Sequence, residues 1–223
     1  MIDYFLRALE STQQWGWVLY RTIYTPGSDQ RCQEAIIRLR ELMISNFEAG
    51  NEDATPEQHS EVIPKLSLVL QEDPAFEHAT LDDLRAHFKE WAPRQGYFHG
   101  ARFKDPRWEV FLLLDEQTLD RILSAPKTAQ RNWNEFYITA VQVNFPGDSR
   151  WTTQEEKRAQ EELDAGDYSN DEDEYEDEDD TPNWPGQVNV CIYYIVTFWH
   201  QLVPERMCLE KWVISARITE TSF

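Results

Sequence analysis

Apolar residues in the first part of the chain change from a strand-like to a helix-like spacing. Residues 16–24 are rich in aromatic and β-branched side chains and end at the turn pair Pro26-Gly27, which predicts a strand. From Asp29 to Phe47 apolar residues recur every three or four positions, which predicts an amphipathic helix. A short helix over residues 3–10 is expected to precede this strand-helix pair.

The same order recurs in the middle of the chain. Residues 80–83 have the form of a capping box and begin a pattern that predicts a helix ending before Pro93. Residues 108–115 form a short apolar run that is typical of a strand covered on both faces. Asp115 can cap the helix expected over residues 116–123.

The remaining patterns complete an α+β fold. Strands are expected over residues 135–145, 188–199 and 211–218, while residues 64–70 are apolar but ambiguous. These elements predict a mixed sheet of about five strands with helices on one face, ferredoxin-like in part, with a long acidic loop insertion. We expect the whole chain, residues 1–223, to form a single domain.

Charge is concentrated in one segment. The chain has 41 acidic and 21 basic residues and a net charge of −20. Residues 155–180 contain 15 of the acidic residues and two basic ones, so the rest of the chain carries only −7. Nine of the ten residues from Asp171 to Asp180 are carboxylates, and such a run cannot bury apolar area. We expect residues 155–183 to form a flexible insertion within the domain.

Composition excludes several classes of partner and location. The acidic balance disfavours direct nucleic-acid binding, which requires clustered Lys and Arg. The N-terminus lacks a secretory signal, and the longest nearly apolar run, residues 190–199, is about half of the ~20 residues that span a bilayer. Cys32, Cys191 and Cys208 form no paired motif, which is typical of a reducing compartment. We expect a cytoplasmic or nuclear protein without a membrane partner.

Candidate catalytic residues come from the histidines and one strand-like run. No two histidines have the spacing that places two imidazoles on one helix face, and no nucleotide-binding or hydrolase motif is present, so we expect no metal and no cofactor. In a strand, Tyr194 and His200 would share one face with Val196 and Phe198. That face either lines an aromatic pocket or packs in the core. His99 is a further acid-base candidate.

Candidate binding residues lie in polar surroundings. Trp133, Trp151 and Trp184 are the tryptophans that fit a partner surface best. Tyr97 and Arg102 belong to an aromatic and basic cluster that either holds an anionic ligand or docks the acidic insertion.

The sequence resembles a family of uncharacterised fungal proteins of similar length. The resemblance rests on Gly16-Trp-Val-Leu-Tyr-Arg-Thr-Ile-Tyr24, on Leu81-Asp-Asp-Leu-Arg-Ala-His-Phe88 with Trp91, and on Phe111-Leu-Leu-Leu-Asp-Glu116 after an Arg-Phe pair at Arg102. It implies a fungal source and a shared fold, but no reaction.

Two functions follow from the sequence. The first is a protein-interaction module whose acidic insertion and exposed tryptophans contact a basic protein surface. The alternative is a small cofactor-independent enzyme of the isomerase or cyclase type, in which an aromatic pocket takes a small-molecule ligand. A closed pocket onto which a histidine and a tyrosine or carboxylate converge would favour the enzyme.

Overall fold

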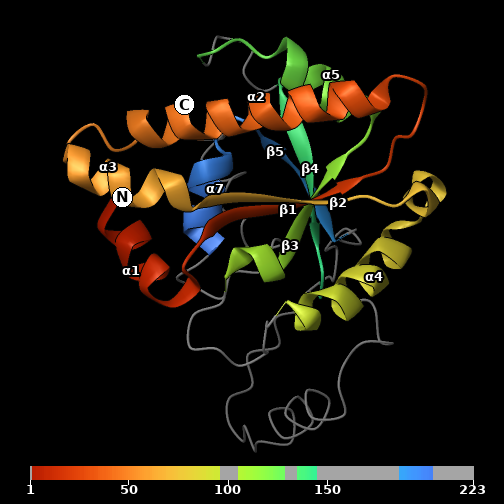
Figure 1. Ribbon diagram of the computed structural model, residues 1–223, viewed down its shortest axis with the longest axis horizontal. Coiled ribbons are helices and arrows are strands. Elements are labelled where there is room, and N and C mark those ends of the chain that lie inside the picture. Colours follow the sequence, from red (N-terminus) through yellow and green to blue (C-terminus); the bar gives the residue numbers. More distant parts are fainter. Residues whose placement is uncertain (1, 96–104, 129–134, 145–185, 203–223) are drawn as a thin grey trace, which may run out of the picture. The chain divides into compact units, whose positions relative to one another are not determined.

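The computed structural model describes residues 2–95, 105–128, 135–144 and 186–202 (Figure 1). The strands are β1 (Trp15–Arg21), β2 (Leu66–Gln71), β3 (Val110–Leu114), β4 (Tyr137–Gln142) and β5 (Gln187–Cys191). The α-helices are α1 (Ile2–Thr12), α2 (Ser28–Ala49), α3 (Pro56–Val62), α4 (Leu81–Arg94), α5 (Glu116–Ser124) and α7 (Ile195–Leu202). Three short 3-10 helices are η1 (Ile63–Lys65), η2 (Pro74–His78) and η3 (Pro106–Trp108).

The strands form one mixed sheet in the order β2-β1-β3-β4-β5. β1 is parallel to both β2 and β3, whereas β4 is antiparallel to β3 and β5. The α+β class and the five-stranded mixed sheet are therefore confirmed. A ferredoxin-like sheet splits its βαβ units, whereas here β1 lies directly beside both parallel neighbours, as in half of a doubly wound sheet.

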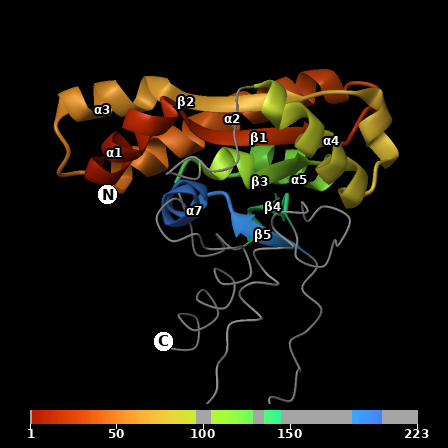
Figure 2. The same ribbon diagram turned by 90° about the horizontal axis from the view of Figure 1, so that it is seen from below.

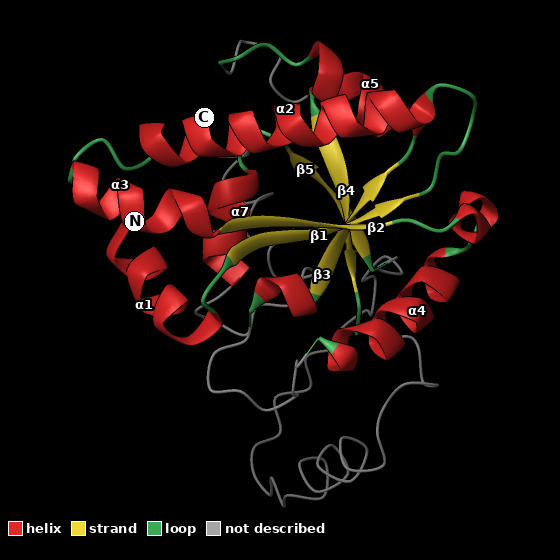
Figure 3. Ribbon diagram, in the orientation of Figure 1, coloured by secondary structure: helices red, strands yellow, loops and turns green. Residues whose placement is uncertain are grey.

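Helices cover both faces of the sheet, rather than the single face that we expected (Figure 3). On one face Trp17 of β1 stacks on Phe198 of α7, with ring centroids 5.3 Å apart. On the other face Tyr20 of β1 packs in a cluster with Phe88 of α4. The crossover through α2 runs from β1 to β2, and the crossover through α4 runs back from β2 past β1 to β3. Because the two crossovers run in opposite directions along the sheet, right-handed connections place their helices on opposite faces.

The predicted strand over residues 188–199 is correct only as far as Cys191. The chain turns after Cys191, where the Tyr194 N–H donates to the Cys191 carbonyl at 2.9 Å, and then forms α7. Phe198 and Trp199 are fully buried in this helix. A continuous apolar run fits a buried strand and a buried helix equally well, and this one contains both.

Smaller differences concern residues 50–95. Thr55 forms an unforeseen capping box that begins α3, and the ambiguous segment after Pro64 contains β2. The capping box at Thr80 is confirmed, but α4 continues through Pro93 to its end. None of the described helices has the length and apolar character needed to cross a membrane.

Two sequence predictions fall elsewhere in the chain. The expected strand 211–218 and the acidic insertion 155–183 lie outside the described residues. All the described helices and strands belong to one compact unit.

Gly16 allows β1 to approach β2 closely. Its φ of +125° is one that side chains rarely adopt, and a Cβ built there would lie 2.1 Å from the Ser67 carbonyl oxygen. This contact shows that the Ser67 carbonyl points from β2 toward β1. Position 16 therefore requires glycine for both its conformation and its space.

Replacing Gly16 by Ala should lower the free energy of unfolding by at least about 3 kcal/mol, because the methyl group collides with backbone and the positive φ becomes strained. Gly27→Ala is the control, since Gly27 also has a positive φ but faces open space. It should cost only about 1 to 2 kcal/mol. Urea unfolding of both variants measures the difference, and equal losses would contradict the close approach.

Candidate functional site

The carboxyl ends of β1, β2 and β3 lie at one edge of the sheet because these strands are parallel. In open α/β sheets, ligands bind beyond this edge where the strand order reverses, which here is between β1 and β3. We call this region the carboxyl edge. It consists of Arg21 to Arg31, Glu72 and Asp73, and Asp115 to Asp120.

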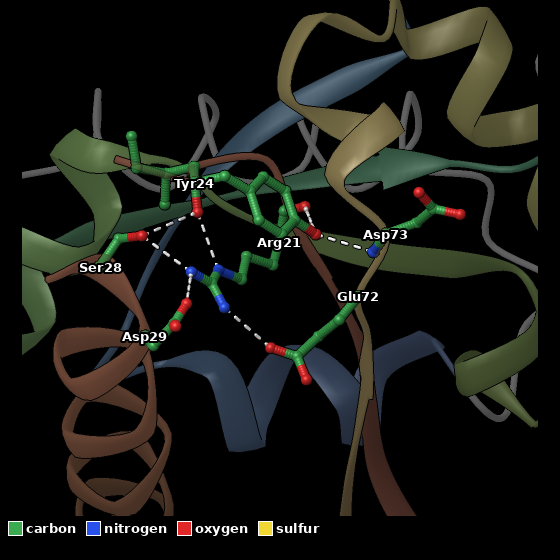
Figure 4. Close-up of polar contacts among 7 residues, drawn as sticks. Arg21, Tyr24, Ser28, Asp29, Glu72 and Asp73 are labelled. Atoms are coloured by element: carbon green, nitrogen blue, oxygen red, sulfur yellow. Dashed lines mark hydrogen bonds and ion pairs between the residues drawn. The ribbon is translucent and has the colours of Figure 1, made fainter. Parts of the chain in front are cut away.

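Arg21, the last residue of β1, is the centre of this edge (Figure 4). Its side chain is only 5 % exposed, and each guanidinium nitrogen has a hydrogen-bond or ion-pair partner. Nε donates to the Ile23 carbonyl at 2.8 Å and Nη1 to Glu72 Oε1 at 3.0 Å. Nη2 donates to Ser28 Oγ at 2.8 Å and forms an ion pair with Asp29. One buried cation thus joins the end of β1, the residue after β2 and the start of α2.

The partners of Arg21 stabilise its positively charged form. Burial alone would lower the pKa of Arg21, but its hydrogen bonds with Asp29 and Glu72 raise the pKa above the ordinary value. The carboxylate of Asp29 is 85 % exposed and that of Glu72 is about half exposed, so both remain hydrated. This arrangement avoids the cost of burying a complete ion pair.

Tyr24 covers the guanidinium from the loop that follows β1. The carbon at the centre of the Arg21 guanidinium lies 4.5 Å from the centroid of the Tyr24 ring, which is a cation-π distance. The Tyr24 hydroxyl donates to the Arg21 carbonyl at 3.2 Å and accepts from the Asp73 N–H at 2.8 Å. Partial burial raises the pKa of Tyr24, so the hydroxyl keeps its proton.

Arg31 makes a second, more exposed connection at the same edge. Its guanidinium on α2 pairs with Glu116 and Asp120 of α5. Asp115 accepts a hydrogen bond from the Thr118 N–H at 2.7 Å, which confirms it as the helix cap that the sequence predicts. Asp115 and Glu116 therefore act in capping and in helix-helix pairing.

The carboxyl edge presents negative charge to solvent. Its two arginines are both paired with carboxylates, and the carboxylates of Asp29, Glu72 and Asp120 are each at least half exposed. A phosphate would have to displace these carboxylates to reach either guanidinium. The edge therefore favours cations over anions.

A tyrosine-histidine pair lies on the α4 face of β1. The Tyr20 hydroxyl and His87 Nδ1 are 2.8 Å apart, and the Phe76 ring lies 4.9 Å from the His87 ring. Burial raises the pKa of Tyr20 far above its ordinary value. A neutral, fully buried tyrosine with one partner fastens α4 to the sheet.

The structure describes two of the residues that the sequence singled out. Tyr194 lies in the turn before α7 and is 49 % exposed, while His200 lies in the last turn of α7 with its ring stacked on Phe5 at 6.1 Å. The shared strand face that we expected for them is wrong, because this part of the chain is helical. The other candidates lie outside the described residues: Tyr97, His99, Arg102, Trp133, Trp151 and Trp184.

A shallow hollow of about 490 Å³ lies between the end of α2 and α3. Neither Tyr194 nor His200 lines it. The histidine that does, His59, bonds through Nε2 to the Asn51 carbonyl at 3.2 Å and packs on Phe47. Within the described ranges, no group of His, Cys, Asp and Glu side chains is arranged to hold a metal ion.

Sequence reasoning missed Arg21 as the centre of the carboxyl edge. The available signal was a charged residue inside an apolar, aromatic run, since a buried arginine requires partners.

Comparisons of the chain with protein-family models, with curated proteins and with solved structures give no match. What the edge does must follow from its own charges.

Arg21→Met should lower the free energy of unfolding by about 2 to 4 kcal/mol, because it removes hydrogen bonds that a buried cation makes to charged partners. Arg31→Met also removes two carboxylate contacts, but from a side chain that is 33 % exposed, and should change stability much less. Denaturant unfolding of the two variants tests this contrast. A loss for Arg31→Met as large as that for Arg21→Met would contradict it.

His200 should make the fold sensitive to acid. Burial lowers its pKa in the folded state below the unfolded value of about 6.5. Between these two values the unfolded chain binds more protons, so this contribution to stability is complete above the unfolded pKa and is lost as the pH falls toward the folded pKa. His200→Gln should therefore lose less stability between about pH 7.5 and pH 5 than the wild type.

Thermal unfolding across this pH range measures the effect. His78→Gln, which replaces an exposed histidine, is the matched control. Parallel pH curves for His200→Gln and the wild type would rule out this source of acid sensitivity.

Proposed function

We propose that the protein is an interaction module that binds a basic protein surface through its acidic insertion, residues 155–183. The observation that carries the proposal is the run from Asp171 to Asp180, in which nine of ten residues are carboxylates. Such a run attracts cationic surfaces over long range and accelerates their encounter. The exposed carboxylates of the carboxyl edge give the described part of the chain the same preference for cations.

The described residues on either side of residues 145–185, the range that contains the insertion, are hydrogen-bonded to each other. The Gln142 N–H donates to the Gly186 carbonyl at 2.9 Å, at the point where β4 ends and β5 follows. Arg85 of α4, only 4 % exposed, donates through Nε to the Gln142 carbonyl at 3.0 Å and through Nη2 to the Gly186 carbonyl at 3.1 Å. These bonds support a hairpin that closes without help from the insertion.

Specificity in this proposal comes from aromatic side chains near the charged run. Trp151 and Trp184 flank the acidic insertion in sequence, and Trp133 precedes β4. Charge accelerates encounter, while buried aromatic contacts supply most of the affinity at protein interfaces. The partner that fits is a basic surface with apolar positions between its Lys and Arg residues.

Changing the nine carboxylates of residues 171–180 to their amides should abolish binding to a basic partner and keep the length of the insertion. The wild type should bind a Lys-rich synthetic peptide at about 50 mM salt and lose at least about tenfold in affinity at about 300 mM salt, because screening weakens the attraction. The amide variant should show no measurable binding at either salt concentration. Isothermal titration measures both.

Two controls separate binding from folding. Replacing residues 145–185 by a short Gly-Asn turn should leave the thermal midpoint within a few degrees, because Arg85 and the Gln142–Gly186 bond close the hairpin. Glu52→Lys and Glu57→Lys alter exposed acidic residues elsewhere and should not change the affinity. An amide variant that binds the peptide as tightly as the wild type would refute the proposal.

A further inference from the structure

β2 forms one outer edge of the described sheet (Figure 2). Its backbone groups alternate in direction, and two contacts fix which residues point outward. The Ser67 carbonyl points toward β1, because a Cβ at Gly16 would strike it. The Leu66 carbonyl points away from β1 and accepts a hydrogen bond from Arg40 Nη1 of α2 at 2.9 Å. The N–H and C=O groups of Leu66, Leu68 and Leu70 therefore face outward.

The outer side of β2 is only partly protected. Arg40 covers the Leu66 carbonyl, but no described residue outside β2 bonds to the outward groups of Leu68 and Leu70. The side chains of Leu68, Val69 and Leu70 are half-buried. An apolar edge strand with open backbone groups pairs readily with another strand, and proteins usually block such edges with charge, proline or a covering element.

Opposite charges lie at the two ends of this edge. Lys65, whose Nζ lies 3.4 Å from Glu61 Oε1, comes directly before β2, and Arg40 lies beside the first residue of the strand. Glu72 and Asp73 follow β2, and both are exposed. Asp73 keeps extended backbone angles, with φ −152° and ψ 126°, so the extended edge continues beyond β2 to this residue. A strand that is positive at its start and negative at its end is complementary to a second copy of itself running in the opposite direction.

We propose that two copies of the chain form a two-fold dimer in which their β2 strands pair antiparallel about Val69, giving one continuous sheet. Leu68 of each copy exchanges backbone hydrogen bonds with Leu70 of the partner subunit. Lys65 lies opposite Asp73 of the partner subunit, and Arg40 lies beside Glu72 of the partner subunit. The same surface patch serves both copies, as closed two-fold symmetry requires.

The register follows from the outward groups and the charges together. Antiparallel pairing brings outward-facing residues opposite outward-facing residues. Of the possible centres, only Leu68 and Val69 place all three outward-facing leucines opposite residues of the extended edge from Leu66 to Asp73. A centre on Leu68 would pair Leu66, whose carbonyl Arg40 already covers, with Leu70, and would leave Lys65 opposite Gln71. A centre on Val69 uses the open groups of Leu68 and Leu70 and brings opposite charges together at both ends.

Sedimentation velocity of the full chain over a range of concentrations, at about 0.15 M salt where like-charge repulsion is screened beyond about 8 Å, measures the dimer. The wild type should change from monomer to dimer as its concentration rises. Lys65→Glu and Asp73→Lys should each weaken the dimer by about tenfold or more, because each places like charges opposite one another at both ends.

Mixing the two variants provides the decisive result. In a heterodimer of Lys65→Glu with Asp73→Lys, both ends again carry opposite charges, so native mass spectrometry should show the heterodimer in excess over either homodimer. Lys127→Glu and Glu52→Lys make the same charge changes at exposed positions away from β2 and should leave dimerisation unchanged. Leu70→Pro should be monomeric, and because the lost N–H faces outward it should keep the fold by circular dichroism.

Some results would overturn the proposal. A wild type that stays monomeric at all concentrations excludes the dimer. A dimer that persists in Leu70→Pro, or a mixture of the charge variants without excess heterodimer, excludes pairing through β2. If Leu70→Pro fails to fold, the mixture of Lys65→Glu with Asp73→Lys still tests whether the dimer pairs through β2.

Discussion

Burial of β1 along its whole length is the constraint on which the rest of the fold depends. All seven residues of this strand are buried, with β2 bonded on one side and β3 on the other. A strand without an exposed face requires helices above and below the sheet. A different helix covers each large side chain of β1. Trp15 packs against α2, Trp17 against α7 and Tyr20 against α4.

The sequence allowed local elements to be predicted better than their assembly. Residues 16–24, the cap at Thr80 and the cap at Asp115 gave the correct strand and helices, because period and capping chemistry are local. The apolar run after Val188 was predicted as one strand, although it contains both β5 and α7. An element covered on all sides has no polar face, so its sequence does not show whether apolar residues repeat with the spacing of a strand or of a helix. We did not predict that helices cover both faces of the sheet. Their placement depends on the strand order, which is set by contacts between residues far apart in the sequence.

The candidate site shows the same division between local and distant information. Arg21 could be recognised as unusual from its apolar surroundings, but its partners Glu72 and Asp29 come together only when β1, β2 and α2 pack. Arg85 likewise joins α4 to the carbonyls of Gln142 and Gly186, at the end of β4 and just before β5. In each case a buried arginine joins several elements of the fold. The planar guanidinium suits this role because it carries several N–H donors in fixed directions.

Strand order separates the two surfaces for which we propose binding. β2 is one edge strand of the described sheet, and the β4–β5 hairpin that carries the insertion forms the opposite edge. Pairing through β2 would therefore leave both hairpins free and give each dimer two acidic insertions. Two linked sites on a partner with repeated basic segments bind more tightly than either alone, since the second contact forms at high effective concentration. Weak contacts by single insertions would then suffice for stable capture, and dissociation of the dimer would release the partner.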